Sequence, residues 1–389
     1  MRRAVIVEAV RSPFAKGREG GALAHLHPVD LFALTLKALV ERADIEPERI
    51  EDLIAGCVIQ VGEQAANIAR QAWLAAGLPA SVPGVTIDRK CGSAQQAIDF
   101  AAQGIIAGAY DLVVAGGVEM MSRVPMRANR LGKDSLGPMF HARYPDGLVH
   151  QGISAELIAA RWQLGREAMD AFALKSHQRA AEAERRGALA REIVPVDGVV
   201  RDEGIRADTS LEKLASLKPA FEDPVALARF PEIRWSVTAG NSSQVTDGAA
   251  ALLLAEESVA AKLGLVPRAA LTHFAVMGDD PVMMLTGIIP ATRKLLSRAG
   301  LGIEDIDRFE VNEAFASVVL AWLAETGADP ARVNVDGGAI AFGHPVGASG
   351  GRLVMSLVRG LEESGGRRGL VAMCESGGMA NATLIERLG

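Results

Sequence analysis

The sequence predicts an α/β protein built from two similar halves, with a further segment inserted into the first half. Three observations support this prediction. Short runs of Val, Ile, Leu and Ala alternate with helical periodicity along the chain, which is typical of layered α/β folds. The pattern recurs about 256 residues later. A stretch between two strands of the first copy has no counterpart in the second copy.

The repeat can be followed through four elements of the chain. In each copy a helical segment leads through an acidic turn into a short strand, and later a small-residue turn opens a helix that precedes another strand. The matching segments are 39–45 with 295–301, 50–54 with 306–310, 91–94 with 347–350, and 112–117 with 369–373. A register kept over four elements indicates a duplicated architecture.

The predicted domain boundaries follow from this comparison. In the second half the last strand follows the strand 369–373 after only a short turn. In the first half the matching strand, 247–254, is separated from the strand 112–117 by more than a hundred residues. The segment between contains a charged amphipathic helix over 163–186. The predicted units are 1–120 completed by 237–265, an inserted loop domain over 121–236, and 266–389.

Composition is that of a soluble enzyme and argues against several other classes. Charged residues make up 23% of the 389 residues and the net charge is −6, with both signs interspersed, so we expect no nucleic-acid partner. No apolar run reaches the ~20 residues of a membrane span, and Glu8 and Arg11 interrupt the apolar start too early for an export signal. The three widely spaced cysteines, Cys57, Cys91 and Cys374, favour a reducing cytoplasm and predict neither disulfides nor a metal site.

Cys91 stands where a predicted strand ends and a helix begins. Small residues follow it, so the pattern is that of a nucleophile displayed on a tight elbow. The helix dipole and the neighbouring Arg89 and Lys90 are expected to stabilise its thiolate. A buried structural cysteine is the alternative interpretation, and we interpret Cys57, at the end of the strand 53–56, in that way.

Three more turns carry reactive side chains. His344 lies in the glycine-rich segment 337–350, which lets the backbone approach a ligand, and its ordinary pKa of about 6.5 suits a general base. No Lys-Ser/Thr pair follows these glycines, so a nucleotide-binding loop is excluded. Asn312 sits where a strand becomes a helix, and helix capping is its alternative role. Cys374 ends another strand, just before 376–378.

Together these segments resemble the four active-site blocks of the thiolase family, in their usual order. The blocks are Cys91–Ala94, Asn312–Ala316, Gly337–Pro345 and Cys374–Gly378. The likeness covers essentially the whole chain, and the intermediate segments Gly240–Ser243 and Ile289–Thr292 match too. It implies a layered αβαβα arrangement of two duplicated halves, with coenzyme A lying against the inserted loop domain.

The resemblance implies roles for the active-site residues. Cys91 is the nucleophile that carries the acyl group, and His344 activates it by taking its proton. Cys374 is the acid/base that removes the acetyl α-proton in synthesis or protonates the carbanion in degradation. Asn312, through a water molecule, would form one oxyanion hole with His344. The backbone N–H groups of Cys91 and Ser376 would form the other.

The resemblance also locates the substrates. Coenzyme A is implied as a co-substrate, with no permanently bound cofactor and no metal. Its contacts are expected at Arg206, Ser243 and His150. A guanidinium suits phosphate geometry, although Arg206 could also be a solvated loop charge. The acyl pocket is expected to include Gln151, Met284 and Phe315. Plain core packing is the alternative for the methionine.

The implied reaction is the reversible cleavage of a 3-oxoacyl-CoA by coenzyme A, giving an acyl-CoA and acetyl-CoA in a ping-pong mechanism through acyl-Cys91. Several departures from the commonest family pattern resemble the actinobacterial thiolases associated with bulky or steroid side chains. They are Gln151, Ala94, Ser376 and the added stretches 222–235 and 279–283. Fatty-acid or steroid side-chain β-oxidation is the expected setting, with a homodimer or homotetramer that could join a β-oxidation partner subunit.

Three alternatives compete with this hypothesis. A biosynthetic thiolase that condenses two acetyl-CoA molecules shares all four blocks, and the sequence does not determine the direction. A ketoacyl synthase would have a second histidine in place of Cys374. A non-catalytic lipid-binding relative would have lost Cys91, His344 or Cys374, and all three are present.

Overall fold

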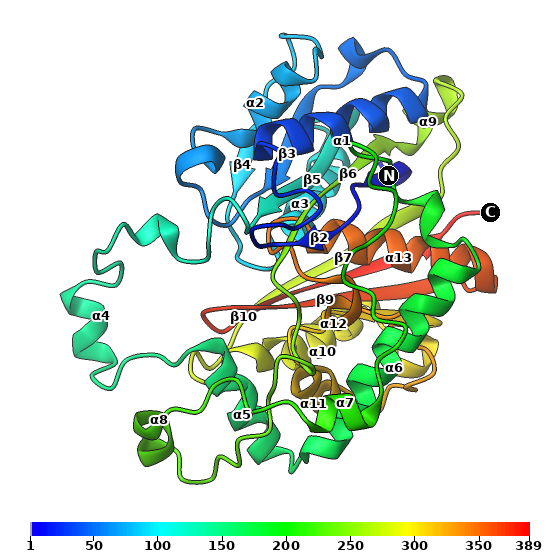
Figure 1. The fold of residues 1–389 in the computed structure, drawn as a ribbon. Helices are drawn as coiled ribbons and strands as arrows, with labels where there is room; N and C mark the ends of the chain where they lie inside the picture. Colours follow the sequence, from blue (N-terminus) through cyan, green and yellow to red (C-terminus); the bar gives the residue numbers. More distant parts are fainter. Residues whose placement is uncertain (1) are drawn as a thin grey trace.

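The computed structural model of the protein describes residues 2–389 (Figure 1). Its strands are β1 (Ala4–Arg11), β2 (Ala15–Lys16), β3 (Asp52–Gly56), β4 (Val85–Ile87), β5 (Leu112–Met120), β6 (Thr246–Glu256), β7 (Ala269–Gly278), β8 (Arg308–Val311), β9 (Arg368–Glu375) and β10 (Met379–Arg387). They form one ten-stranded mixed sheet in the order β4-β3-β5-β6-β1-β7-β10-β9-β8, with β2 paired to β6.

The α-helices surround and separate these strands. They are α1 (Pro28–Ala43), α2 (Ile68–Ala75), α3 (Ser93–Ala107), α4 (Pro138–Arg143), α5 (Gln151–Arg161), α6 (Arg166–Arg185), α7 (Leu211–Ala215), α8 (Pro224–Arg229), α9 (Glu257–Lys262), α10 (Ile288–Ala299), α11 (Ala316–Thr326), α12 (Ala339–Phe342) and α13 (Ser349–Ser364). Within residues 2–389, no helix is both long enough and apolar enough to cross a lipid bilayer.

The two ends of the sheet repeat one strand pattern. In the first half β3 is parallel to β5, and β6 runs antiparallel to both β5 and β1. In the second half β8 is parallel to β9, and β10 runs antiparallel to both β9 and β7. The halves join where β1 pairs with β7. The pairs β3 and β8, α3 and α13, and β5 and β9 each begin 256 residues apart, so the predicted duplicated α/β fold is confirmed.

The layers follow from which faces of the sheet are apolar. Side chains of α3 and α13 share one core with strands from both halves, so these two helices form the central layer (Figure 1). Helices α1 and α2 cover the outer face of the first half, and α10 and α11 cover that of the second half. Alternating side chains of the strands supply both faces, as the period of two requires.

Glycines let the first turns of the two central helices approach at backbone contact. A Cβ on Gly56, at the end of β3, would lie 2.6 Å from Ala94 N and 2.7 Å from Gly347 O. A Cβ on Gly350, in the first turn of α13, would overlap the backbone N of Gln95 in α3. Larger residues at these positions would force the helix N-termini apart. The turns that precede α3 and α13 therefore face each other.

The chain between β5 and β6 forms helices and loops that pack on the second half. Helix α5 packs against α11, and α6 packs against α11 and α12, while α4 projects away from the rest of the molecule (Figure 1). The predicted charged amphipathic helix is α6, whose buried face includes Ala173, Ser176 and Ala180. This packing brings the segment between β5 and β6 beside the strand ends of the second half.

Candidate active site

Four side chains that are far apart in the sequence meet in the interior. Asn312 Nδ2 lies 3.5 Å from His344 Nε2 and 3.8 Å from Cys374 Sγ. Cys374 lies close enough to Cys91 for negative charge on it to raise the pKa of the Cys91 thiol, and hydrogen bonding by the backbone N–H of Ser376 lowers that pKa. All four side chains are buried. The structure thus brings together all five residues predicted for the catalytic centre.

The turn before α3 has the geometry of a nucleophile elbow. Lys90 adopts a left-handed φ of 50°, which is uncommon for a residue with a side chain. The Ser93 hydroxyl closes the turn, because it accepts from Arg89 N at 2.9 Å and donates to Lys90 O at 2.6 Å. Cys91 is held immediately before Gly92, the N-cap of α3.

Burial raises the pKa of the Cys91 thiol above its usual range. The neighbouring Cys374 and Glu375 raise this pKa further, since negative charge on either group would repel a thiolate. The N–H groups of Ser376 and of Cys91 itself oppose the shift by hydrogen bonding. Cys91 therefore rests as a neutral thiol, and a base must take its proton during a reaction.

The prediction that Arg89 and Lys90 stabilise the Cys91 thiolate is wrong for the resting protein. Lys90 Nζ pairs instead with Asp88 Oδ2 at 2.6 Å, on the outer side of the turn. The charge of Arg89 acts on the carboxylate of Glu375. Neither Arg89 nor Lys90 is among the groups that shift the pKa of the Cys91 thiol.

The loop before α13 fixes the backbone of His344. Gly343 has a φ of 99°, and a Cβ there would overlap the hydroxyl of Thr246. The His344 N–H donates to Gln244 O at 3.0 Å and lies 3.0 Å from Thr246 Oγ1. Glycine is required at 343 both for the left-handed backbone and for this close approach.

The Nδ1 side of the His344 ring is held by a serine hydroxyl. Its Nδ1 lies 2.6 Å from Ser349 Oγ, and that hydroxyl donates to Pro345 O at 2.9 Å. Since the hydroxyl has one hydrogen, it must accept from Nδ1–H, which leaves Nε2 without a proton. Burial, with a smaller effect of Arg352, lowers the pKa of His344 to about 4. A neutral imidazole with an unprotonated Nε2 is suited to take a proton.

Asn312 extends the strand β8 and does not cap a helix. Its N–H donates to Ala372 O at 2.9 Å, and α11 begins four residues later with Phe315 as its N-cap. Its side-chain Oδ1 is buried and has no hydrogen-bond partner. The next residue, Glu313, accepts from Ser176, from Asn334 and from the N–H of Ile340, which ties this turn to the glycine-rich loop.

Cys374 lies next to the end of β9. Burial raises its pKa to about 12, the hydrogen bond from Asn312 lowers it, and Glu375 raises it. The following turn contains Gly377 and Gly378, both with positive φ. Because Asp279 O would lie only 2.6 Å from a Cβ on Gly378, the loop after β7 packs directly against this turn.

The centre therefore holds two neutral thiols, an unprotonated imidazole nitrogen and several fixed N–H donors in a buried space. This set can form a covalent thioester, move protons between sulfur and nitrogen, and stabilise an oxyanion. Among residues 2–389, no cluster of His, Cys, Asp and Glu side chains is arranged to hold a metal ion.

The three residues predicted to contact coenzyme A lie outside this buried centre. Arg206 is exposed on a turn and donates from its backbone to His177 Nδ1 at 3.2 Å. Ser243 is half-buried and its N–H donates to Ala314 O at 2.9 Å, two residues from Asn312. His150 is exposed and caps α5 by accepting from Gly152 N.

Two of the three predicted acyl-pocket residues lie in one apolar cluster. Phe315 and Met284 are buried in the same core cluster, and Gln151 is half-buried at the start of α5. Met284 has an unusual backbone, with φ 50° and ψ −57°. Its burial in the core cluster also agrees with the alternative role of core packing.

Phe221 was missed by the sequence analysis. Its ring lies 5.3 Å from the ring of His150 and 5.9 Å from that of Phe315, measured between ring centroids. It thus links a residue predicted for coenzyme A to one predicted for the acyl pocket. Nothing in the local sequence distinguishes this phenylalanine, because both contacts are made over long chain separations. Ser349 lies in the glycine-rich segment 337–350 and Glu375 in the block Cys374–Gly378, but the sequence predicted no role for either residue.

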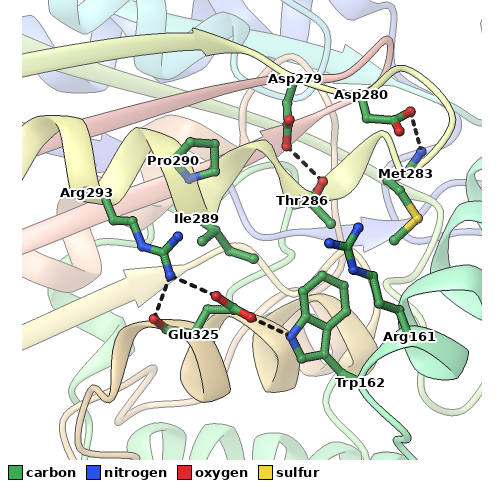
Figure 2. A pocket seen from close by; sticks show the side chains of 10 residues that line it. All are labelled: Arg161, Trp162, Asp279, Asp280, Met283, Thr286, Ile289, Pro290, Arg293 and Glu325. Carbon is green, nitrogen blue, oxygen red and sulfur yellow. Dashed lines mark hydrogen bonds and ion pairs between the residues drawn. The ribbon is translucent and has the colours of Figure 1, made fainter.

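The added stretch 279–283 lines a surface cavity of about 190 Å³ (Figure 2). Its ten lining residues are Arg161, Trp162, Asp279, Asp280, Met283, Thr286, Ile289, Pro290, Arg293 and Glu325. Glu325 accepts from Trp162 Nε1 at 3.0 Å and from Arg293 at 2.7 Å, so the charges of Glu325 and Arg293 compensate each other. No predicted site residue lines this cavity.

Comparisons with known proteins agree over the full length of the chain. Residues 4–258 match the family described as thiolase, N-terminal domain, and residues 265–387 match thiolase, C-terminal domain. The steroid 3-ketoacyl-CoA thiolase FadA6 of Mycobacterium tuberculosis is 49% identical over 400 residues, which cover 100% of this chain and 95% of that protein. The 3-ketoacyl-CoA thiolase of Bacillus subtilis is 40% identical over 403 residues, covering 99% and 100%.

A solved structure is similar over the same range. The crystal structure of the Bacillus anthracis acetyl-CoA acetyltransferase aligns with a TM-score of 0.88 and 39% sequence identity. The alignment covers 100% of this chain and 99% of that one.

Proposed function

The chain belongs to the thiolase family, and from this premise we propose that it cleaves 3-oxoacyl-CoA thioesters with coenzyme A, through an acyl group carried on Cys91. The observation that carries this proposal is a buried cluster in which Asn312 contacts both the unprotonated Nε2 of His344 and the thiol of Cys374, while Cys374 in turn affects the ionisation of the Cys91 thiol. Each step of the cleavage can be assigned to one of these groups.

The first half-reaction breaks the bond between C2 and C3 of the substrate. His344 Nε2 takes the proton of Cys91, and the thiolate attacks the C3 carbonyl. As the C2–C3 bond breaks, its electron pair leaves as the enolate of acetyl-CoA, which takes a proton from Cys374. The products are acyl-Cys91 and acetyl-CoA, with Cys374 as thiolate and His344 protonated.

The second half-reaction restores the protein. The Cys374 thiolate takes the proton of the incoming coenzyme A, and the coenzyme A sulfur attacks the acyl-Cys91 carbonyl. Acyl-CoA leaves, and Cys91 recovers its proton from His344. Atoms and charges balance over the two halves.

Two sets of donors would stabilise the oxygens that gain charge. The N–H groups of Cys91 and Ser376 would serve the carbonyl attached to Cys91, which is supported by the Ser376 hydrogen bond to that sulfur. Protonated His344 and a water held by Asn312 would serve the enolate, and the unpartnered Oδ1 of Asn312 supports such a water. Each donor is typically worth about 3 kcal/mol in the transition state.

We further propose that residues 121–236 are the coenzyme A-binding unit, inserted in a first half formed by 1–120 and 237–265 and followed by a second half over 266–389. Coenzyme A would contact Arg206, Ser243 and His150. The exposed guanidinium of Arg206 supports this assignment, because it is free to meet phosphate. The contact between Ser243 and Ala314 supports it as well, since it leads from the surface toward Asn312. The acyl group would extend past Gln151, Met284 and Phe315.

The cleavage direction with a larger acyl group is better supported than acetyl-CoA condensation. Relatives over 40% identical carry names such as steroid 3-ketoacyl-CoA thiolase and, in Escherichia coli K12, 3-oxoadipyl-CoA/3-oxo-5,6-dehydrosuberyl-CoA thiolase. We propose a role in fatty-acid or steroid side-chain degradation, by a homodimer or homotetramer that could join a β-oxidation partner subunit. The three free cysteines support a reducing, cytoplasmic setting.

The test uses the purified protein with acetoacetyl-CoA and with a longer 3-oxoacyl-CoA, each with free coenzyme A. Loss of the 3-oxoacyl absorbance reports cleavage, and intact-mass analysis after acyl-CoA treatment reports the adduct. We expect cleavage, faster for the longer substrate, with an adduct that is absent from Cys91→Ala. No cleavage and no adduct with either substrate would overturn the proposal and favour a lipid-binding protein.

A further inference from the structure

Glu375 is a buried carboxyl group at the catalytic centre that the mechanism above does not use. It ends β9 directly after Cys374, and its side chain is fully buried. A Cβ on Gly92 would overlap Glu375 Oε1, so the carboxyl group lies against the residue that follows Cys91. Neither carboxyl oxygen has a hydrogen-bond partner.

The charged groups around Glu375 come from the turn before α3 and from α3 itself. The turn before α3 contributes Asp88 and Arg89, and α3 itself contributes Asp99. The two thiols are also neighbours, because negative charge on Glu375 raises the pKa of both Cys91 and Cys374. Arg89 is the only positive group among these neighbours.

This environment favours a protonated Glu375. Burial raises its pKa to about 8, Arg89 opposes the shift, and the carboxylates Asp99 and Asp88 add to it. An unpaired buried carboxylate would lack the donors that normally compensate its charge. Near neutral pH the group therefore keeps its proton for most of the time.

We propose that Glu375 is a positioning residue that sets the charge of the catalytic centre: Cys91 can form a thiolate readily only while Glu375 is uncharged. This inference rests on the proposed function for the role of Cys91. The reason is electrostatic, since thiolysis forms a thiolate at Cys91 and later one at Cys374. An ionised Glu375 would place a third negative charge beside both, in a space from which water is largely excluded. Loss of its proton at alkaline pH thus raises the pKa of Cys91.

The experiment measures the rate at which iodoacetamide alkylates Cys91 from about pH 6.5 to about pH 10, with peptide mass analysis to assign the modified cysteine. In the unmodified protein, the logarithm of the rate should rise less steeply above about pH 8, where Glu375 ionises. Glu375→Gln has the same shape and no charge, so its plot should show no such bend. At about pH 9.5 we expect it to react about tenfold faster than the unmodified protein, the effect of one pKa unit.

Two variants accompany this comparison. Glu119→Gln removes another buried carboxyl group whose pKa is raised, to about 7, but which contacts the Cys57 turn. It should keep the bend. Glu375→Asp keeps a titratable group on a shorter side chain, so its bend should move to another pH. The pH profile of kcat/KM should change in the same way, with KM for coenzyme A unaffected.

Three results would overturn the inference. They are an unmodified protein without a bend, a Glu375→Gln profile that keeps the bend, and a Glu119→Gln profile that loses it. If Glu375→Gln does not fold, an unmoved bend in Glu375→Asp is equally decisive. Alkylation needs no substrate, so the outcome does not depend on thiolase activity. The two proposals can therefore fail separately.

Discussion

Ser349 Oγ lies 2.6 Å from His344 Nδ1, and this contact determines which nitrogen of the imidazole ring is free to take a proton. The hydroxyl belongs to the first residue of α13 and is held by its bond to Pro345 O. The ring orientation therefore depends on where the central helix begins. A one-turn displacement of that helix would leave Nδ1–H without a partner.

Replacing Ser349 should lower activity more than stability. In Ser349→Ala the ring can rotate or change tautomer, so we expect kcat to fall by on the order of ten- to a hundredfold, as when a partner that orients a histidine is removed. Steady-state cleavage kinetics check this. Ser364→Ala is the matched control, because Ser364 makes the same bond to a carbonyl four residues earlier in α13 but contacts no histidine. Equal kcat values for the two variants would contradict the prediction.

Cys374→Ala should remove the proton transfer at the acetyl carbon. Incubation of acetyl-CoA in D₂O, followed by mass analysis, should show exchange of the methyl protons in the unmodified protein. The variant should exchange roughly 10²- to 10⁴-fold more slowly, the usual contribution of a general acid or base. Cys57→Ala is the control, since Cys57 is also a free, buried thiol but lies beside Glu119. Exchange at the unmodified rate in Cys374→Ala would assign the proton transfer to another group.

The neutral His344 should make the protein less stable in mild acid. Burial lowers its pKa to about 4, whereas the unfolded chain has the ordinary 6.5. Below pH 6.5 the unfolded state binds a proton that the folded state does not, so stability is lost as pH falls from 6.5 toward 4. The full effect is roughly 3 kcal/mol in the free energy of unfolding. Urea unfolding at about pH 8 and pH 5 should show a smaller loss for His344→Gln than for the unmodified protein.

A buried ion pair should contribute to the attachment of the segment between β5 and β6. Arg11 at the end of β1 donates to both carboxylate oxygens of Asp202, at 2.7 and 2.8 Å, and both side chains are fully buried. Asp202→Asn would leave the guanidinium under-compensated, with only Glu192 near it, and should reduce the free energy of unfolding by about 3 kcal/mol. The exposed pair of Arg185 and Glu182 is the comparison. Glu182→Gln should change the free energy of unfolding by less than about 1 kcal/mol. Similar effects of both substitutions, measured by denaturant unfolding, would contradict this account.

Part of the site could be predicted because its signals are local. The elbow at Cys91 follows from a strand, a turn and a helix in immediate succession, and the repeat of β3, α3 and β5 is written in the order of apolar segments. Gly343 and Gly350 are also local signals, because a glycine indicates a position where another part of the chain can approach the backbone closely. Their lack of a side chain is a property of the chain itself.

Other features depended on neighbours that the sequence does not identify. Asn312 was interpreted as a possible helix cap, but α11 begins later and the side chain faces His344 and Cys374. Phe221 gains its role from His150 and Phe315, which lie far from it along the chain.

The sequence by itself determined the duplicated α/β fold and indicated the candidate reactive side chains, since local periodicity and turn chemistry depend on residues near one another in the chain. Only the tertiary structure decided the charge states of those side chains. Arg89 and Lys90 precede Cys91 directly in the sequence. The pKa of the thiol is nevertheless raised, by burial and by Glu375, which is far from Cys91 along the chain but close to it in the folded protein. A pKa depends on how much water and which charges surround a group, and those surroundings are assembled from segments that meet only in the folded protein.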